Sequence, residues 1–184
     1  MTQEKMELGK KMDIALHYTA YNLRKTGHNT KPVLFHSFKV AYKLYQYGYS
    51  EDVVIAAILH DLLEDTSVTK EDIKVKFGES IANIVSAVSF DSNIKDKLEQ
   101  ARVMFQNCID YGIEAVILKC ADLIDNIDYV SFVKDKEKRD VLLAKYKLFL
   151  LMSENLIGNT EVYKELETKV KDEEEKIWGN HIKF

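Results

Sequence analysis

The chain has 184 residues, of which 46% are hydrophobic and 30% are charged, with a net charge of −4. This composition excludes a disordered or fibrous chain, and the length suits one globular domain over residues 1–184. The negative charge leaves no basic surface for nonspecific nucleic-acid binding. A membrane span needs about 18 consecutive apolar residues, and no stretch approaches that. We therefore expect neither a nucleic-acid nor a membrane partner.

The two cysteines, Cys108 and Cys120, are too few and too far apart for a disulfide scaffold or a cysteine-based zinc site. Free thiols suit a reducing compartment, and we predict a cytoplasmic protein. The sequence leaves the oligomeric state open.

The chain has only one proline and seven glycines, which are the residues that most often interrupt helices. Most of the glycines fall between segments with helical periodicity. Strand-like alternation never extends beyond four residues, and no internal repeat occurs. The sequence therefore predicts an all-α fold. In chain order, the apolar stripes predict helices over residues 8–23, 38–45, 53–63, 69–77, 81–88, 98–111, 117–124, 142–156 and 161–178.

Two helix starts carry capping signals. Ser50, followed by two acidic residues, is typical of an N-cap at the positive end of a helix dipole. The run over 53–63 that follows is apolar on nearly every side, so we expect this helix to be central. Thr69 and Asp72 predict a capping box for a short helix that Gly78 ends.

Ionisable residues gather at the end of that apolar run. Glu64 follows His60 by four residues and Asp65 follows Asp61 by four, so helical periodicity places two pairs in adjacent columns. Three carboxylates beside an imidazole repel one another unless a cation neutralises them. Imidazole nitrogen and carboxylate oxygen are suitable ligands for a divalent metal. The cluster therefore indicates a metal site.

Two more ionisable residues lie in apolar settings that a surface position explains poorly. His36 lies between Phe35 and Phe38, and Asp122 follows an apolar helix face. Each taken alone is typical of a core or capping residue. The order His, His-Asp, Asp resembles that of the HD superfamily of metal-dependent phosphohydrolases.

The resemblance is closest to the hydrolase domain of RelA/SpoT proteins and to the stand-alone small alarmone hydrolases. It covers roughly residues 20–130, and helices over about 138–178 follow. It is carried by the block from His60 to Thr66, by Lys119-Cys120-Ala121-Asp122 with Asn126, and by Arg24-Lys25-Thr26-Gly27. The fold that it implies is an all-helical HD-domain bundle, in agreement with the periodicity.

The resemblance also implies roles for residues. It implies that His36, His60, Asp61 and Asp122 bind one divalent cation, commonly Mn²⁺, and that Glu64 and Asp65 activate the attacking water. Asn126 would support the site, and Arg24 would contact the base. Lys25 and Lys119 would supply positive charge for an anionic nucleotide. The predicted activity is removal of the 3′-diphosphate from ppGpp or a related purine nucleotide.

The chain departs from the family pattern at positions that concern the substrate. Ser37 replaces a proline, about three extra residues lie within 28–31, and Leu123 and Asp125 replace a typical arginine and histidine. Two alternatives therefore stay open. One is an HD-type nucleotidase acting on deoxynucleoside monophosphates, and the other is a non-catalytic module that senses a nucleotide.

Overall fold

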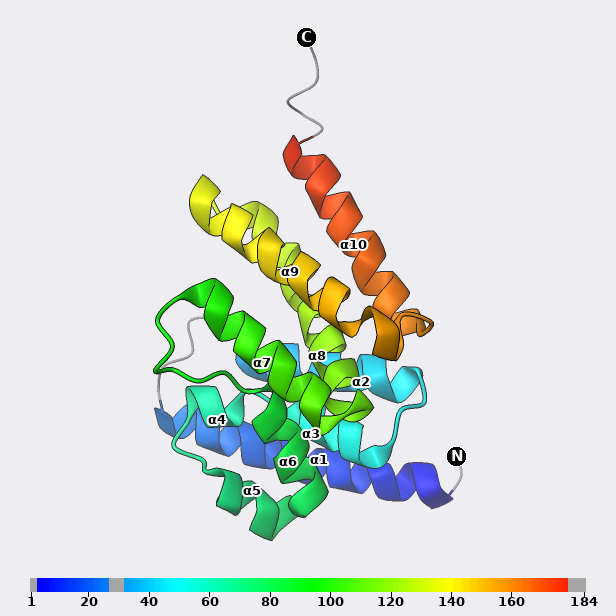
Figure 1. The fold of residues 1–184 in the computed structure, drawn as a ribbon. Coiled ribbons are helices and arrows are strands. Elements are labelled where there is room, and N and C mark those ends of the chain that lie inside the picture. The colour runs from blue at the N-terminus through cyan, green and yellow to red at the C-terminus, as the bar shows by residue number, and fades with distance from the viewer. Residues whose placement is uncertain (1–2, 27–31, 179–184) are drawn as a thin grey trace. The chain divides into compact units, whose positions relative to one another are not determined.

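The computed structural model describes residues 3–26 and 32–178 (Figure 1). Within these ranges all regular structure is helical and no strand occurs, which confirms the all-α prediction. None of the helices described there is long and apolar enough to cross a membrane. The helices are α1 (Gln3–Thr26), α2 (Val33–Gln46), α3 (Glu51–Leu59), α4 (Leu62–Asp65), α5 (Lys70–Phe77), α6 (Glu79–Val88), α7 (Lys97–Tyr111), α8 (Ile113–Asn126), the 3₁₀ helix η1 (Ile127–Phe132), α9 (Lys136–Ile157) and α10 (Glu161–Trp178).

The chain forms two compact units, Met1–Ser89 and Phe90–Phe184, each with helices packed around one buried helix. The first unit contains α1 to α6. The second contains α7 to α10 with η1.

In the first unit the central element is α3, as the apolar run predicted. Every residue from Val53 to Leu59 is buried, and α1, α2 and α6 all pack against α3. Thr19 of α1 donates a buried hydrogen bond from Oγ1 to the carbonyl of Ile58 at 3.2 Å. This contact joins α1 to the end of α3, where the ionisable cluster begins.

The helix over 53–63 is interrupted, which the periodicity did not predict. The α3 helix ends at Leu59, and α4 begins at Leu62 after a turn at His60 and Asp61. Both turn residues keep right-handed backbone angles, but the amide of Glu64 bonds to the carbonyl of Asp61 only three residues back, at 3.2 Å. Side-chain periodicity continues through such a turn, so the sequence pattern does not reveal it.

Capping residues start the helices where their side chains reach the free amides. Ser50 is the N-cap residue of α3, at the predicted position, although its side chain makes no capping hydrogen bond. Thr69 and Asp72 form the predicted capping box: Thr69 Oγ1 accepts from the Asp72 amide at 3.2 Å, and Asp72 Oδ2 accepts from the Thr69 amide at 2.8 Å. Gly78 ends α5 with φ of 100°, a conformation that glycine adopts without strain.

The second unit is built around α8. All residues from Ala115 to Asp125 are buried, and α7, α9, α10 and η1 pack on this helix. Figure 1 shows α9 and α10 as an antiparallel hairpin, which agrees with the two helices predicted over 142–156 and 161–178. Tyr163 donates from its hydroxyl to the Leu150 carbonyl at 3.2 Å across this hairpin. The 3₁₀ helix η1 was not predicted.

Candidate metal and catalytic site

The site begins with His60, which directly follows the last residue of α3. Its Nδ1 lies 2.7 Å from the carbonyl oxygen of Ala57. A carbonyl only accepts hydrogen bonds, so Nδ1 carries the proton and Nε2 presents a lone pair. This second hydrogen bond is the arrangement that orients metal-binding histidines. The C-terminal end of α3, with its partial negative charge, also favours a cation here.

His36 of α2 faces the same point. Its Nε2 lies 3.3 Å from Nε2 of His60, and the two rings meet edge to face with centroids 5.1 Å apart. Both histidines are buried. The sequence separates them by 24 residues, and the packing of α2 on α3 brings them together.

Asp61 completes this cluster within the first unit. Its Oδ1 lies 3.2 Å from His60 Nε2, and its Oδ2 lies 3.9 Å from His36 Nε2. Oδ2 is buried and has no hydrogen-bond donor among the described residues. A buried carboxylate oxygen in this state is costly unless a cation or a donor satisfies it. A metal ion bound by Asp61 would satisfy this oxygen.

The donor atoms have the chemistry and spacing that a divalent cation needs. Ligands at right angles on an ion with bonds of about 2.1 Å are about 3 Å apart, close to the separations from His60 Nε2 of 3.3 Å to His36 Nε2 and 3.2 Å to Asp61 Oδ1. Two imidazoles and a carboxylate suit Mn²⁺, Fe²⁺ or Zn²⁺. We refer to His36, His60 and Asp61 as the His-Asp cluster.

Glu64 and Asp65 lie on α4, immediately after the His-Asp cluster. Both are partly buried, and the Asp65 amide bonds to the Asp61 carbonyl at 2.9 Å. Thr66 closes the short helix by donating from Oγ1 to the Leu62 carbonyl at 2.6 Å. The structure therefore keeps both predicted catalytic carboxylates within one turn of Asp61.

In the second unit, Asp122 is held by its neighbours on one face of α8. Lys119 Nζ lies 2.8 Å from Asp122 Oδ2, and Asn126 Nδ2 donates to Oδ1 at 2.5 Å. Asp122 and Lys119 are both buried, so the lysine compensates the charge of the carboxylate. The i−3 and i+4 spacing was visible in the sequence, but the prediction gave these residues separate roles. The structure joins them in one network.

Arg24 and Lys25 occupy the last turn of α1 and are exposed. The extra residues at 28–31, together with Gly27, lie outside the described residues. Leu123 and Asp125, the departures from the family pattern, are both buried on α8. Neither side chain supplies the positive charge that the family pattern has at these positions.

Sequence reasoning assigned Tyr146 of α9 to a core stripe and missed its electrostatic setting. The phenol is buried, and burial raises the pKa of Tyr146, with further increases from Asp122, Asp128 and Glu173. The hydroxyl therefore stays protonated and keeps its capacity to donate. The predicted apolar stripe over 142–156 contains Tyr146 but gives no signal for the acidic residues around it.

The helical fold and the His-Asp pair at the end of a buried helix define the class of an HD domain. The match to the family model "HD domain" covers residues 14–152 and runs through both units. The chain belongs to the HD domain family.

Several relatives are named as hydrolases of one nucleotide. A guanosine-3′,5′-bis(diphosphate) 3′-pyrophosphohydrolase from Aquifex aeolicus is 30% identical over 169 residues, which are 90% of this chain and 23% of that protein. A guanosine-3′,5′-bis(diphosphate) 3′-pyrophosphohydrolase called MESH1, from Drosophila melanogaster, is 35% identical over 77 residues. These are 42% of this chain and 42% of that protein. The chain thus spans about a quarter of the Aquifex relative.

Two solved structures are similar in fold. One is described as a metazoan ortholog of SpoT that hydrolyzes ppGpp; it has a TM-score of 0.73 and 25% identity, over 91% of this chain and 95% of that one. The other, from Listeria monocytogenes, has a TM-score of 0.68 and 24% identity, over 79% of this chain and 99% of that one. The second shows the fold alone.

Proposed function

We propose that this chain is a metal-dependent phosphohydrolase that removes the 3′-diphosphate of guanosine 3′,5′-bis(diphosphate) or a closely related purine nucleotide. The observation that carries the proposal is the convergence of His36 Nε2, His60 Nε2 and the Asp61 carboxylate, with the His60 tautomer set by the Ala57 carbonyl. The similarity to named 3′-pyrophosphohydrolases supports the substrate class.

The proposed ligands of one divalent cation are His36, His60, Asp61 and Asp122, and Mn²⁺ is the proposed ion. The first three are supported by their mutual distances. Asp122 is supported by the sequence pattern and by the Lys119 and Asn126 contacts that orient its carboxylate within the second unit. When bound, such an ion lowers the pKa of water and stabilises negative charge on a phosphoryl oxygen.

The remaining roles belong to side chains near these ligands. Glu64 and Asp65 accept the proton of the attacking water, since a carboxylate within reach acts as a general base. Asn126 acts by holding Asp122 through its amide.

Arg24, Lys25 and Lys119 are the proposed substrate contacts. An arginine guanidinium stacks on a base and donates to its edge, and the exposed position of Arg24 leaves it accessible for this. The pairing of Lys119 with Asp122 gives that lysine a second role in orienting the carboxylate.

We further propose that residues 1–184 function as one HD-type domain, since the family match runs through both units. The partner is a small nucleotide, with no nucleic-acid or membrane partner, and the proposed location is the cytoplasm.

Leu123 and Asp125 favour a second candidate, an HD-type nucleotidase acting on deoxynucleoside monophosphates. Both positions differ from the basic residues of the ppGpp hydrolase pattern, and both side chains are buried. This candidate keeps the same metal site and changes only the substrate.

A nucleotide panel with added Mn²⁺ separates the two candidates. Guanosine 3′,5′-bis(diphosphate) and deoxynucleoside monophosphates are incubated separately with the chain, and the released anion is identified as diphosphate or orthophosphate. Diphosphate from the first substrate supports the proposal. Orthophosphate from the monophosphates, without diphosphate from the first, would reject it in favour of the nucleotidase.

A further inference from the structure

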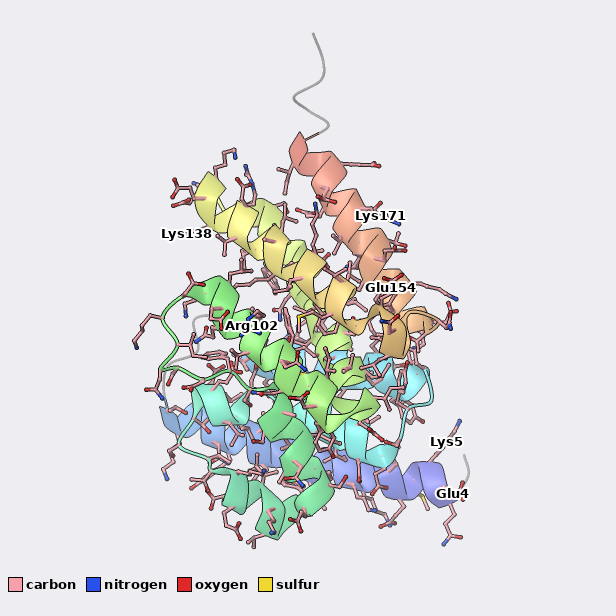
Figure 2. All side chains as sticks on the ribbon, in the orientation of Figure 1. Glu4, Lys5, Arg102, Lys138, Glu154 and Lys171 are labelled. Atoms are coloured by element: carbon pink, nitrogen blue, oxygen red, sulfur yellow. The ribbon has the colours of Figure 1, made fainter. Side chains whose placement is uncertain are left out.

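A cavity in the second unit carries more positive than negative charge. Its volume is about 540 Å³, and its charged lining residues are Lys97 at the start of α7 and Glu137, Lys138 and Lys145 of α9. Val133, Val141 and Leu142 form its apolar wall. Figure 2 shows Lys138 near the N-terminal end of α9. Three lysines against one glutamate give this cavity a positive potential in a chain whose net charge is −4, so it attracts small anions.

The lysines that line the cavity differ from their neighbours on α9. Lys147 pairs with Glu174, and Lys136 Nζ lies 2.6 Å from Asp140 Oδ2. Within the described part of the chain, Lys145 forms no ion pair with a carboxylate, and Lys97 Nζ donates to the neutral amide oxygen of Gln100 at 3.2 Å. Lys97 Nζ also lies 5.9 Å from the centroid of the Phe90 ring, and Lys138 is exposed. Neither contact of Lys97 neutralises its charge, so the cavity keeps positive charge for an anion from solution.

Lys145 is less exposed than the other two cavity lysines, since Lys97 and Lys138 are both exposed. It is half-buried, and burial lowers the pKa of Lys145, helped by the positive charges of Lys97 and Lys119 and opposed by Asp96. A desolvated lysine beside other cations is an activated nucleophile, because the neutral amine is the reactive form.

We propose that Lys145 is a covalent modification site, acylated by small acyl phosphates whose phosphate group is held in this cavity by Lys97 and Lys138. The Lys145 nitrogen bonds to the acyl carbon, the bond from that carbon to the phosphate oxygen breaks, and phosphate departs with the proton that the amine loses. The product is a neutral amide. The cavity thus supplies both the anion site and the nucleophile.

The modification has an electrostatic consequence within the second unit. It removes the positive charge of Lys145 and with it the repulsion between Lys145 and Lys119, the lysine that pairs with Asp122. This inference does not depend on the proposed hydrolase activity, and its test uses no nucleotide.

The probe for the test is acetyl phosphate, applied briefly to the full chain at pH 8, with acetylation of each lysine measured by peptide mass spectrometry. Lys147, two residues away and paired with Glu174, is the internal control. We expect at least about fivefold more acetyl groups on Lys145 than on Lys147, since the neutral amine and the bound phosphate act together. Equal labelling of the two lysines would overturn the proposal.

Two further arms test the part played by the cavity. Lys97→Gln should lower labelling of Lys145 several-fold, while Lys136→Gln, which removes a paired lysine outside the cavity, should leave it unchanged. Acetic anhydride, which carries no phosphate, should label Lys145 with less preference over Lys147 than acetyl phosphate does. An unchanged rate in Lys97→Gln, or equal preference with both reagents, would show that the cavity does not hold the phosphate and would overturn the proposal.

Discussion

The hydrogen bond from His60 Nδ1 to the Ala57 carbonyl decides which ring nitrogen faces His36 and Asp61. With Nε2 of His60 unprotonated, its lone pair, Nε2 of His36 at 3.3 Å and the Asp61 carboxylate converge in a buried space. The same atoms without a cation would leave Asp61 Oδ2 unsatisfied. At the scale of single residues, the His-Asp cluster therefore has the donor atoms that could hold a metal ion.

Asp61→Asn tests this explanation because it keeps the size of the side chain and removes its charge. Loss of residues that only orient a ligand weakens metal binding by about 10- to 100-fold, so loss of a direct ligand should weaken Mn²⁺ binding at least as much. Isothermal titration of the metal-free chain measures the affinity. Asp52→Asn, at the other end of α3, is the control and should bind normally; equal affinity in both variants would exclude Asp61 as a ligand.

Glu64→Gln and Asp65→Asn test the proposed general base. Each should lower turnover by about 10²-fold or more while Mn²⁺ remains bound, because general-base assistance contributes about 10² to 10⁴. Turnover and metal content are measured on the same preparations. Glu71→Gln, an exposed carboxylate of α5, is the control. Near-normal turnover in both test variants would remove these carboxylates from the mechanism.

At the scale of elements, helix ends were predictable where a capping residue or glycine marks them. The side chains of Thr69 and Asp72 form a capping box at the start of α5, and Gly78 has a positive φ at its end. The break at His60 and Asp61 has no such mark, because both residues keep helical backbone angles. The approach of His36 to His60 was expected only from the family resemblance; no local pattern contains it, since the packing of α2 on α3 determines it.

Thr69→Ala tests the energetic value of the capping box. The substitution removes the acceptor of the Asp72 amide, and loss of a threonine N-cap costs about 1 kcal/mol, with a range of about 0.5 to 2. Urea denaturation should show this loss in the free energy of unfolding. Ser67→Ala, an exposed neighbour, should change stability by less than about 0.5 kcal/mol, and an equal effect of both changes would argue against the box.

For the whole molecule, apolar periodicity predicted the helical class and the central place of α3, which is apolar on nearly all sides. It predicted a helix over 117–124 as well, but not that α8 is the buried centre of the second unit. The gathering of ionisable groups at the end of α3 was predictable, because charged groups inside apolar helices need compensation. The boundary between the two compact units lies at a polar segment over 89–97, which the sequence does not distinguish from an ordinary loop between helices. The surroundings of Tyr146 depend on α8, η1 and α10 together, which no local pattern contains.

The two thiols report on the integrity of the second unit. Cys108 and Cys120 are fully buried, and burial raises the pKa of Cys108 to about 12. Thiolate is the reactive form, so neither should react rapidly with a disulfide reagent at pH 8 in the folded chain, and both should react in denaturant. Rapid reaction of one thiol in the folded chain would contradict this packing.

The thiols also affect stability at high pH. Since the folded pKa of Cys108 lies above the value of 9.0 for a free thiol, the unfolded state loses this proton first. The thiol's contribution to the free energy of unfolding is therefore complete below about pH 9 and is lost as the pH rises toward about 12. Comparing Cys108→Ala with the unmodified chain between pH 7 and 10 isolates this contribution.

The most direct test of the account is diphosphate release from guanosine 3′,5′-bis(diphosphate) by the chelator-treated full chain as Mn²⁺ is restored. We predict that the activity is absent without metal and rises with occupancy to a plateau at about one Mn²⁺ per chain. His60→Asn should remain inactive at the same metal concentrations, whereas the exposed His17→Asn should behave as the unmodified chain. Release of no diphosphate at any Mn²⁺ concentration, or equal activity in His60→Asn, would contradict the account.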